Sequence, residues 1–261
     1  MTTTRDLYRE ERQDEILQLV NQEGRVEVAV LSQQFGVSAV TIRGDLQALA
    51  ERDLLVRTHG GAMALPALGT ELPAFALRKE LHLAQKEKIG QAAADLVRDG
   101  DSIALDASTT AWQIARHLKD RRELTIVTNG LFVALEFLDS PSVTVVMPGG
   151  SLRAESASLV GDQGAGILDR YHVQKGFFGA GGFTIEEGLT DTNQYEVELK
   201  QHMVQRSKQV IAVIDSSKWG QVTFASLAAV NELDHVISDQ AAPPDLVSSL
   251  RELGVRVTLV K

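Results

Sequence analysis

One stretch of the sequence places several hydroxyl groups at the start of a predicted helix. Asp106-Ala107-Ser108-Thr109-Thr110 follows a strand-like segment and supplies three hydroxyl groups directly before a helical pattern. The start of a helix has free backbone N–H groups and the positive end of the helix dipole, so it attracts anions. Phosphate is the most natural occupant, and we expect Ser108, Thr109 and Thr110 to bind it.

Three further polar segments also follow strand-like segments: Thr128-Asn129-Gly130, Gly149-Gly150-Ser151-Leu152-Arg153 and Asp215-Ser216-Ser217-Lys218. In open α/β sheets, ligands bind beyond the carboxyl ends of the strands. The four segments together predict a site for a small, polyhydroxylated, phosphorylated ligand. Positive charge would come from Lys218 or Arg153, and other polar side chains would meet the ligand's hydroxyl groups. The residues predicted to form this ligand site are Asp106, Ser108, Thr109, Thr110, Asn129, Gly150, Arg153, Glu196 and Lys218.

Each of these segments also has an ordinary structural interpretation. A Ser-Thr-Thr run before a helix is most often a simple N-cap. Lys218 alone is typical of a solvated loop, and Gly149-Gly150 alone is typical of a turn. Their shared position after predicted strands favours the ligand site over these separate interpretations.

The elements that would position these residues alternate between strands and helices. Strand-like segments occupy residues 102–106, 124–128, 143–147, 173–179, 209–215, 235–238 and 256–260. Helical patterns occupy residues 76–98, 110–118, 131–138, 162–171, 194–207 and 245–253. This alternation predicts an α/β domain with a mainly parallel sheet and helices on both faces.

A different pattern precedes this domain. Residues 28–35 predict a short helix, Gly36-Val37-Ser38 a tight turn, and residues 39–51 a second helix. An alternating strand over 54–58 and a turn at His59-Gly60-Gly61 follow, and Val26 and Val28 could form a strand that pairs with them. This order is that of a winged helix-turn-helix, whose second helix enters a DNA major groove.

The second helix of this unit has one apolar and one outward face. Ile42, Leu46 and Leu49 share the face predicted to be buried. Ser38 is placed to cap the helix, and the outward face offers few large side chains, which allows close approach to base edges. Thr41 and Arg43 flank that face and could hold phosphates, or in the case of Arg43 a guanine edge. The predicted DNA-contacting residues are Ser38, Val40, Thr41, Arg43, Gly44, Gln47, Arg57 and His59.

The charge of the chain does not, at face value, favour nucleic acid. The net charge is −9, and residues 1–65 hold seven arginines and ten acidic residues, a net of −3. Six of those ten acids lie before residue 25, outside the two-helix unit. Because DNA binders usually have a basic surface, we expect modest affinity from one copy and joint binding by several copies.

Composition excludes several classes. The 261 residues are 44% hydrophobic and 23% charged, as in ordinary globular proteins. No cysteine is present, so disulfides and thiolate metal sites are excluded. No apolar run approaches the ~20 residues of a membrane span, and the first residues are too charged for a signal peptide. We expect a cytoplasmic protein without a cofactor, a metal or membrane contact.

Several motifs resemble the DeoR family of bacterial transcription regulators. They are Arg12-x3-Ile16-x3-Val20, Ser38-x2-Thr41-Ile42-Arg43-x-Asp45-Leu46 and Arg57-Thr58-His59-Gly60-Gly61-Ala62. Gly44 departs from the basic or polar residue usual there. Glycine lowers helix propensity by ~1 kcal/mol and removes a possible base contact.

From about Arg78 onward, the chain resembles the effector domain of that family, which is similar in fold to ribose-5-phosphate isomerase. The family's Asp-Ser-Gly-Thr-Thr motif corresponds to residues 106–110, with Ala107-Ser108 in place of Ser-Gly. Its Thr-Asn, Gly-Gly and Asp-Ser-Ser-Lys segments match those at 128–129, 149–150 and 215–218. The resemblance covers nearly the whole chain and implies phosphorylated sugars or related metabolites as ligands.

The resulting expectation is a winged helix-turn-helix over 1–62, a linker over 63–75 and an effector domain over 76–261. We expect a homo-oligomer (dimer or tetramer) that binds operator DNA. The resemblance to the family implies a repressor of a carbohydrate-utilisation operon, with operator binding controlled by a sugar phosphate. One alternative is a sugar-phosphate isomerase with an accessory winged helix, but Phe178-Gly179-Ala180-Gly181-Gly182 lacks the carboxylates that proton transfer needs. We therefore expect no catalytic residue. Another alternative is a winged helix for protein contact, which the acidic charge favours and Thr41 and Arg43 disfavour.

Overall fold

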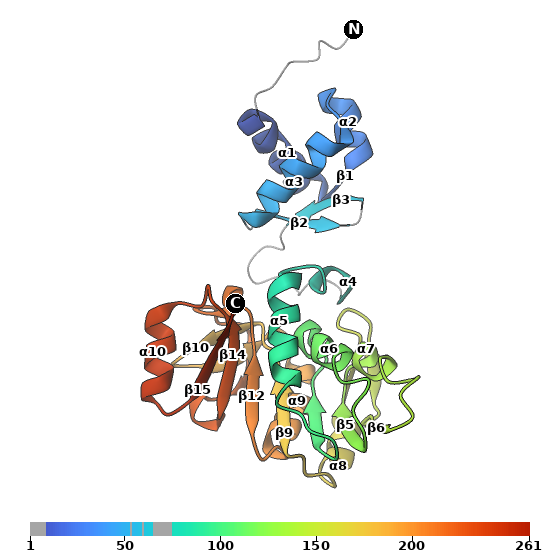
Figure 1. Ribbon diagram of the computed structural model, residues 1–261, viewed down its shortest axis with the longest axis vertical. Coiled ribbons are helices and arrows are strands. Elements are labelled where there is room, and N and C mark those ends of the chain that lie inside the picture. Colours follow the sequence, from blue (N-terminus) through green and yellow to red (C-terminus); the bar gives the residue numbers. More distant parts are fainter. Residues whose placement is uncertain (1–8, 53, 59, 65–74) are drawn as a thin grey trace. The chain divides into compact units, whose positions relative to one another are not determined.

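The computed structural model describes residues 9–52, 54–58, 60–64 and 75–261. Contacts within the chain divide it into two units, Met1–Leu81 and His82–Lys261 (Figure 1). Each unit is described by itself below. Most of the predicted linker, residues 65–74, lies outside the described residues.

The first unit has the predicted helix-turn-helix with a β wing. Its elements are α1 (Arg9–Glu23), β1 (Arg25–Glu27), α2 (Val28–Phe35), α3 (Ala39–Glu51), β2 (Leu55–Thr58) and β3 (Gly61–Ala64). The three strands form an antiparallel sheet in the order β1-β3-β2, so the strand expected at Val26 does pair with the wing. Strand β3 runs to Ala64, two residues beyond the end expected for this domain.

The turn between α2 and α3 follows from two residues. Gly36 ends α2 with φ 65°, a left-handed conformation that glycine adopts without a steric penalty. Ser38 then begins α3 as its N-cap. The apolar faces of the helices meet in one core that includes Ile16, Leu31 and Ile42. This core holds α2 and α3 together with α1, with the apolar face of α3 buried as predicted.

The second unit is built on a seven-stranded sheet in which every pairing is parallel, in the order β15-β14-β12-β9-β4-β5-β6. The strands are β4 (Ser102–Leu105), β5 (Leu124–Thr128), β6 (Val143–Val146), β9 (Lys175–Phe178), β12 (Val210–Val213), β14 (His235–Asp239) and β15 (Arg256–Val260). The predicted parallel α/β architecture is confirmed. All seven carboxyl ends lie along one edge of the sheet.

Helices cover both faces of this sheet, as expected. On one face, α5 (Leu83–Ala94), α6 (Thr109–Arg116) and α7 (Leu131–Leu135) contribute to one apolar core. On the other, α8 (Asp162–Leu168), α9 (Gln194–Gln205) and α10 (Pro244–Glu252) contribute to a second. Short 3-10 turns, η1 (Ser216–Lys218) and η2 (Val230–Glu232), connect later elements.

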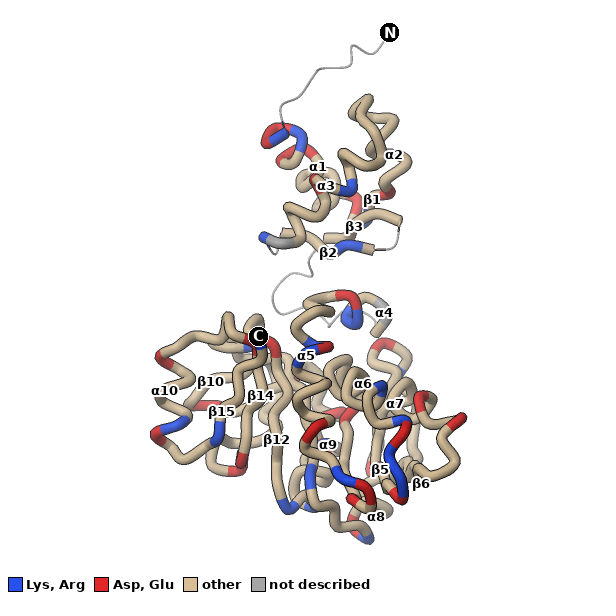
Figure 2. The backbone as a smooth tube through the Cα atoms, viewed as in Figure 1, with Lys and Arg blue, Asp and Glu red and all other residues tan. Residues whose placement is uncertain are grey.

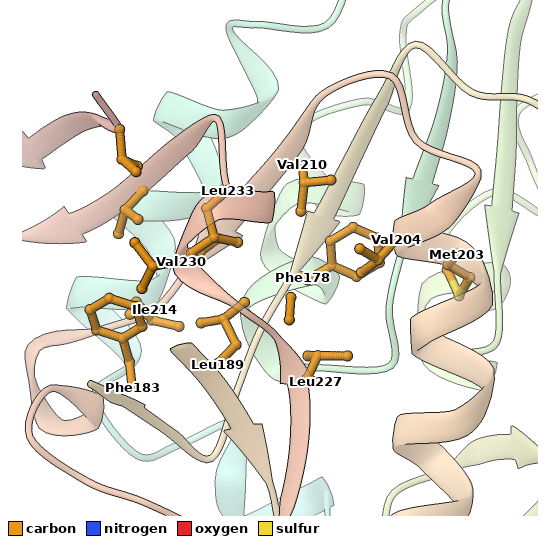
Figure 3. Close-up of a cluster of buried hydrophobic side chains, with 14 of the residues drawn as sticks. Phe178, Phe183, Leu189, Met203, Val204, Val210, Ile214, Leu227, Val230 and Leu233 are labelled. Atoms are coloured by element: carbon orange, nitrogen blue, oxygen red, sulfur yellow. The ribbon is translucent and has the colours of Figure 1, made fainter. Parts of the chain in front are cut away.

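Five short strands were not expected. The hairpin of β7 (Ser151–Arg153) and β8 (Ser158–Val160) is one addition. The other is an antiparallel sheet of β10 (Gly182–Thr184), β11 (Gly188–Asp191) and β13 (Ala225–Ala228). Phe183, Leu189 and Leu227 of that sheet pack with Phe178 in the core shown in Figure 3. Each of these five strands depends on pairing with another strand of its hairpin or small sheet, which the local sequence pattern does not indicate.

The single helical pattern expected over 76–98 is wrong in one respect. The structure breaks it into α4 (Phe75–Arg78) and α5, and His82 between them has φ 50°, in the left-handed region. An α-helix cannot continue through a left-handed residue, so the helix is interrupted at His82. The spacing of the apolar side chains on either side does not reveal this interruption. None of the described helices is long and apolar enough to cross a membrane.

Candidate DNA-binding surface and candidate effector site

The predicted outward face of α3 is open to solvent. The Ser38 hydroxyl accepts a hydrogen bond from the Thr41 backbone N–H at 3.1 Å, and the two hydroxyl oxygens lie 2.9 Å apart. Val40 is 74% exposed, and Arg43 and Gly44 are also exposed. An exposed apolar β-branched side chain on this face could contact a thymine methyl group. The first turn of α3 is thus available for a DNA groove.

A hydrogen bond links the wing to the recognition helix. The Arg57 guanidinium on β2 donates to the side-chain oxygen of Gln47 on α3 at 2.9 Å. Both residues are predicted DNA contacts, and this bond fixes the orientation of the Gln47 amide relative to the wing. His59, the other predicted wing contact, lies outside the described residues.

A buried ion pair that the sequence did not indicate holds α3 in place. Asp45 is 2% exposed and accepts from the Arg12 Nε at 2.6 Å and from the Gln13 amide at 3.1 Å. Arg9 approaches the same carboxylate at 3.6 Å. Asp45 therefore fixes α3 against α1 rather than facing DNA, and its arginine partners neutralise a carboxylate that would otherwise repel phosphates.

The Asp106–Thr110 segment forms a tight turn at the start of α6. The buried Asp106 carboxylate accepts from the Ser108 backbone N–H at 3.0 Å and from the Gly179 N–H at 2.9 Å. The Ser108 hydroxyl caps α6 by accepting from the Ala111 N–H at 3.0 Å. Thr109 and Thr110 are each 5% exposed. The ordinary capping role of Ser108 is thus present, and Asp106 organises the turn.

Lys200 on α9 is buried and contacts two carboxylates and a carbonyl oxygen in this region. Its ammonium group lies 2.8 Å from the Asp106 carboxylate, 2.9 Å from the Asp191 carboxylate and 2.7 Å from the Gly179 carbonyl oxygen. Burial alone would lower the pKa of Lys200, but the charges of Asp106 and Asp191 outweigh burial and raise it. The lysine stays charged and joins the loops after β4 and β9 to β11.

Sequence reasoning missed Lys200, although a signal was present. Lys200 lies three residues after Val197 and four before Val204, on the buried stripe of α9. A lysine in the middle of an apolar helix face indicates a buried charge with acidic partners.

Two carboxylates lie beside the 178–182 segment, where the isomerase alternative requires an acid or a base. The 178–182 segment itself has none, but the structure places Asp106 and Asp191 beside it, from other strands. An added Cβ at Gly179 would lie 2.5 Å from the Ser108 side chain, which shows how closely the two loops approach. Because both carboxylates are paired with Lys200, neither is poised as a free base.

Asn129 lies next to this turn, on the loop after β5. Its side chain is fully buried, and its amide nitrogen donates to the Leu159 carbonyl at 3.4 Å. Its side-chain oxygen has no hydrogen-bond partner among the described residues. The neighbouring Gly130 packs on Ala107, where an added Cβ would lie 2.9 Å from the Ala107 Cα. The β4 and β5 loops are therefore in contact, as expected.

The charges of Arg153 and Glu196 face each other. The Arg153 Nε lies 3.2 Å from the Glu196 carboxylate, which joins the β7–β8 hairpin to the start of α9. Gly150, just before β7, has φ 112°, and an added Cβ would lie 2.4 Å from the Val160 carbonyl oxygen. The predicted residues Arg153 and Glu196 thus come together, but each neutralises part of the other's charge.

Lys218 belongs to a second group, after β12. Asp215 is buried and accepts from the Ser217 backbone N–H at 3.1 Å, which shapes η1. Burial would raise the pKa of the Asp215 carboxyl, but the positive charges of Lys218 and Lys86 outweigh it and hold the pKa below its usual value. Strand β12 pairs with β9, so this group shares the carboxyl edge with the Asp106 turn.

Comparison with known proteins identifies the family. A model of the DeoR-like helix-turn-helix domain matches residues 12–66, and a model of the DeoR C terminal sensor domain matches residues 81–240. The chain belongs to the DeoR family. It is a DNA-binding transcription regulator with an N-terminal helix-turn-helix and a parallel α/β sensor domain. The prediction of the family and of this fold class is confirmed.

Relatives match over almost the full length. The uncharacterized HTH-type transcriptional regulator YulB of Bacillus subtilis (strain 168) is 38% identical over 250 residues, covering 96% of each chain. The glycerol-3-phosphate regulon repressor of Escherichia coli (strain K12) is 30% identical over 249 residues, covering 95% of this chain and 98% of the relative. Ribose 5-phosphate isomerase A of Methanocaldococcus jannaschii is a distant likeness in fold, with a TM-score of 0.38 and 20% identity over 51% of this chain and 53% of that one.

Proposed function

We propose that the protein represses a carbohydrate-utilisation operon and that a phosphorylated sugar metabolite, bound at the carboxyl edge of the sensor sheet, controls its operator binding. The similarity to a glycerol-3-phosphate regulon repressor supports the direction of control and the chemical class of the effector. The proposed effector residues are those expected from the sequence, now joined by Lys200, which positions the turn.

One observation carries the effector half of this proposal. The side-chain oxygen of Asn129 is buried and lacks a donor among the described residues. A buried acceptor without a partner costs about 1–3 kcal/mol, and a ligand hydroxyl would remove that cost. The acceptor lies on a loop that contacts the segment leading into α6, whose first N–H groups favour phosphate. A phosphorylated polyol satisfies both groups at once.

The proposal that the protein binds operator DNA is supported by the exposed face of α3. Thr41 and Arg43 are exposed beside the small outward face, as a major-groove reader requires. Since residues 1–65 have a net charge of −3, we propose that a dimer or tetramer brings two α3 helices to two operator half-sites.

We further propose that the sensor domain binds its ligand without turnover. The carboxylates nearest Gly179 are both held by Lys200, so no free base faces a substrate carbon. Incubation with ribose 5-phosphate tests this: the aldose should remain unchanged, and formation of ketose product would support the isomerase alternative.

The proposal is tested by thermal unfolding of the full chain against a panel of sugar phosphates. A ligand at 100 times its dissociation constant should stabilise the protein by about 2.7 kcal/mol. Asn129→Ala should lose this stabilisation, while Lys208→Ala, at an exposed position outside the site, should keep it. Equal stabilisation of both variants would place the ligand elsewhere.

A further inference from the structure

A second concave region lies at the opposite edge of the sensor sheet. A cleft of about 650 Å³ opens at the amino ends of β9, β12, β14 and β15, beside the ends of α5 and α10. Small-molecule sites usually have volumes of ~300–1,000 Å³, so the cleft can hold a metabolite. It shares no residue with the proposed effector site at the carboxyl edge.

The rim of this cleft is basic in an acidic chain. Its lining includes the basic residues Arg98, Lys175, Arg251 and Arg256 and the acidic residues Asp95 and Asp234, four positive charges against two negative. The chain as a whole has a formal charge of −9. Figure 2 shows basic segments near the end of α10 and the amino end of β15.

Three of the four cations have no ion-pair partner among the described residues. Lys175 is paired with Asp101 at 2.7 Å. Arg98, Arg251 and Arg256 form no ion pair with any carboxylate in the part of the chain that the structure describes. Arg98 acts on the nearby Asp101 carboxylate, and Arg251 donates to the Val257 carbonyl oxygen at 3.3 Å, but the lining keeps an excess of positive charge.

The two acids on the rim already have partners. The Asp234 carboxylate accepts from the Val210 backbone N–H at 2.8 Å. The Asp95 carboxylate accepts from the Gln91 amide at 2.9 Å. Neither hydrogen bond involves an arginine of the rim, so these acids offset the positive potential only in part.

The floor of the cleft is uncharged at neutral pH. Ile211 and Val255 are buried there, and His235 is 7% exposed. Burial, with the nearby charge of Arg256, lowers the pKa of His235 to about 4. Its Nε2 lies 2.9 Å from the Thr258 hydroxyl. A neutral, partly apolar floor below a guanidinium rim suits a compact anion with a carbon skeleton.

We propose that this cleft is a second ligand site, which binds a small polyanion such as a phosphorylated or polycarboxylate metabolite. Arginine is suited to this class because its planar group makes two parallel hydrogen bonds to one phosphate or carboxylate. The proposal goes beyond the effector-controlled repression described above and does not depend on it. The competing explanation is that the arginines only complement the negative dipole ends of α5 and α10.

The test follows the His235 imidazole by NMR in the full chain labelled at histidine, with inorganic pyrophosphate as the probe. A His235→Gln variant identifies the signal. The probe should shift this signal saturably, since it would bind directly above the ring. Absence of a saturable shift would support the dipole explanation and overturn the proposal.

Two variants of equal charge change locate the anion. Arg251→Ala/Arg256→Ala should raise the dissociation constant about tenfold or more, since charged hydrogen bonds are lost. Lys88→Ala/Arg170→Ala removes two exposed cations that do not line the cleft and should leave the dissociation constant nearly unchanged. Equal weakening by both pairs would show general charge attraction, and loss of binding in Lys218→Ala would place the anion at the other edge. Either result overturns the proposal.

Discussion

At the scale of single residues, the sensor domain depends on one buried ammonium group. Lys200 holds Asp106, Asp191 and the Gly179 carbonyl within 2.9 Å. These groups come from the ends of β4, β9 and β11, which are distant in the sequence. The geometry of the proposed phosphate turn therefore depends on a residue that need not touch the ligand.

Replacement of Lys200 tests this dependence. Lys200→Met should lower the free energy of unfolding by about 3–5 kcal/mol, because it leaves two buried carboxylates without a partner. Urea unfolding measures the change, and the exposed Lys208→Met serves as the matched control. Adding Asp191→Asn to Lys200→Met should recover part of the loss. A loss no larger than that of the control would contradict the role assigned to Lys200.

His235 predicts a pH dependence of stability. Its pKa falls from 6.5 in the unfolded chain to about 4 in the folded chain. Between these pH values the unfolded state is protonated at His235 and the folded state is not. Stability from this residue is complete above pH 6.5 and declines as pH falls toward 4. At pH 5 the decline should be about 2 kcal/mol. His235→Gln should reduce the difference in unfolding free energy between pH 7 and pH 5 by this amount; an identical difference in both proteins would refute it.

At the scale of elements, two glycines of the DNA-binding unit should respond oppositely to alanine. An added Cβ at Gly44 in α3 meets nothing within 4 Å, whereas at Gly61 in β3 it would lie 1.9 Å from the Val26 carbonyl oxygen. Gly44→Ala should therefore stabilise α3 by about 1 kcal/mol, and Gly61→Ala should destabilise the wing by more than about 1 kcal/mol. Hydrogen exchange at the amides of each element measures both effects. Destabilisation by Gly44→Ala would contradict the open surface assigned to α3.

The elements also show what sequence alone could predict. The period of two in β5 and β15, and the cap and turn residues around α2 and α3, are local signals, and the structure contains each of these elements where expected. The strands β7, β8, β10, β11 and β13 are stabilised by tertiary pairing and have no local signal. The Arg12–Asp45 pair and the Lys200 cluster join residues distant in sequence. The helical spacing of Lys200 could indicate a buried charge, but the local sequence does not identify the partners in either group.

For the whole molecule, the acidic charge favours our proposal that more than one copy binds each operator. The acid at Asp45 is neutralised inside the first unit, but the chain still has a formal charge of −9. We expect several α3 helices to engage one operator, and the phosphate contacts of all copies then add together. The affinity should therefore fall steeply as salt increases, as phosphate contacts require.

We propose that a phosphorylated metabolite bound to the sensor domain controls binding of α3 to DNA. The most direct test is fluorescence anisotropy with promoter DNA from beside the gene, with and without the sugar phosphate that stabilises the protein. The ligand should change the affinity of the unmodified protein for DNA by at least about fivefold. Thr41→Ala/Arg43→Ala should lose DNA binding but keep ligand stabilisation, and Lys218→Ala should bind DNA without responding to the ligand. Unchanged DNA affinity at saturating ligand, or loss of both properties in both variants, would contradict the account.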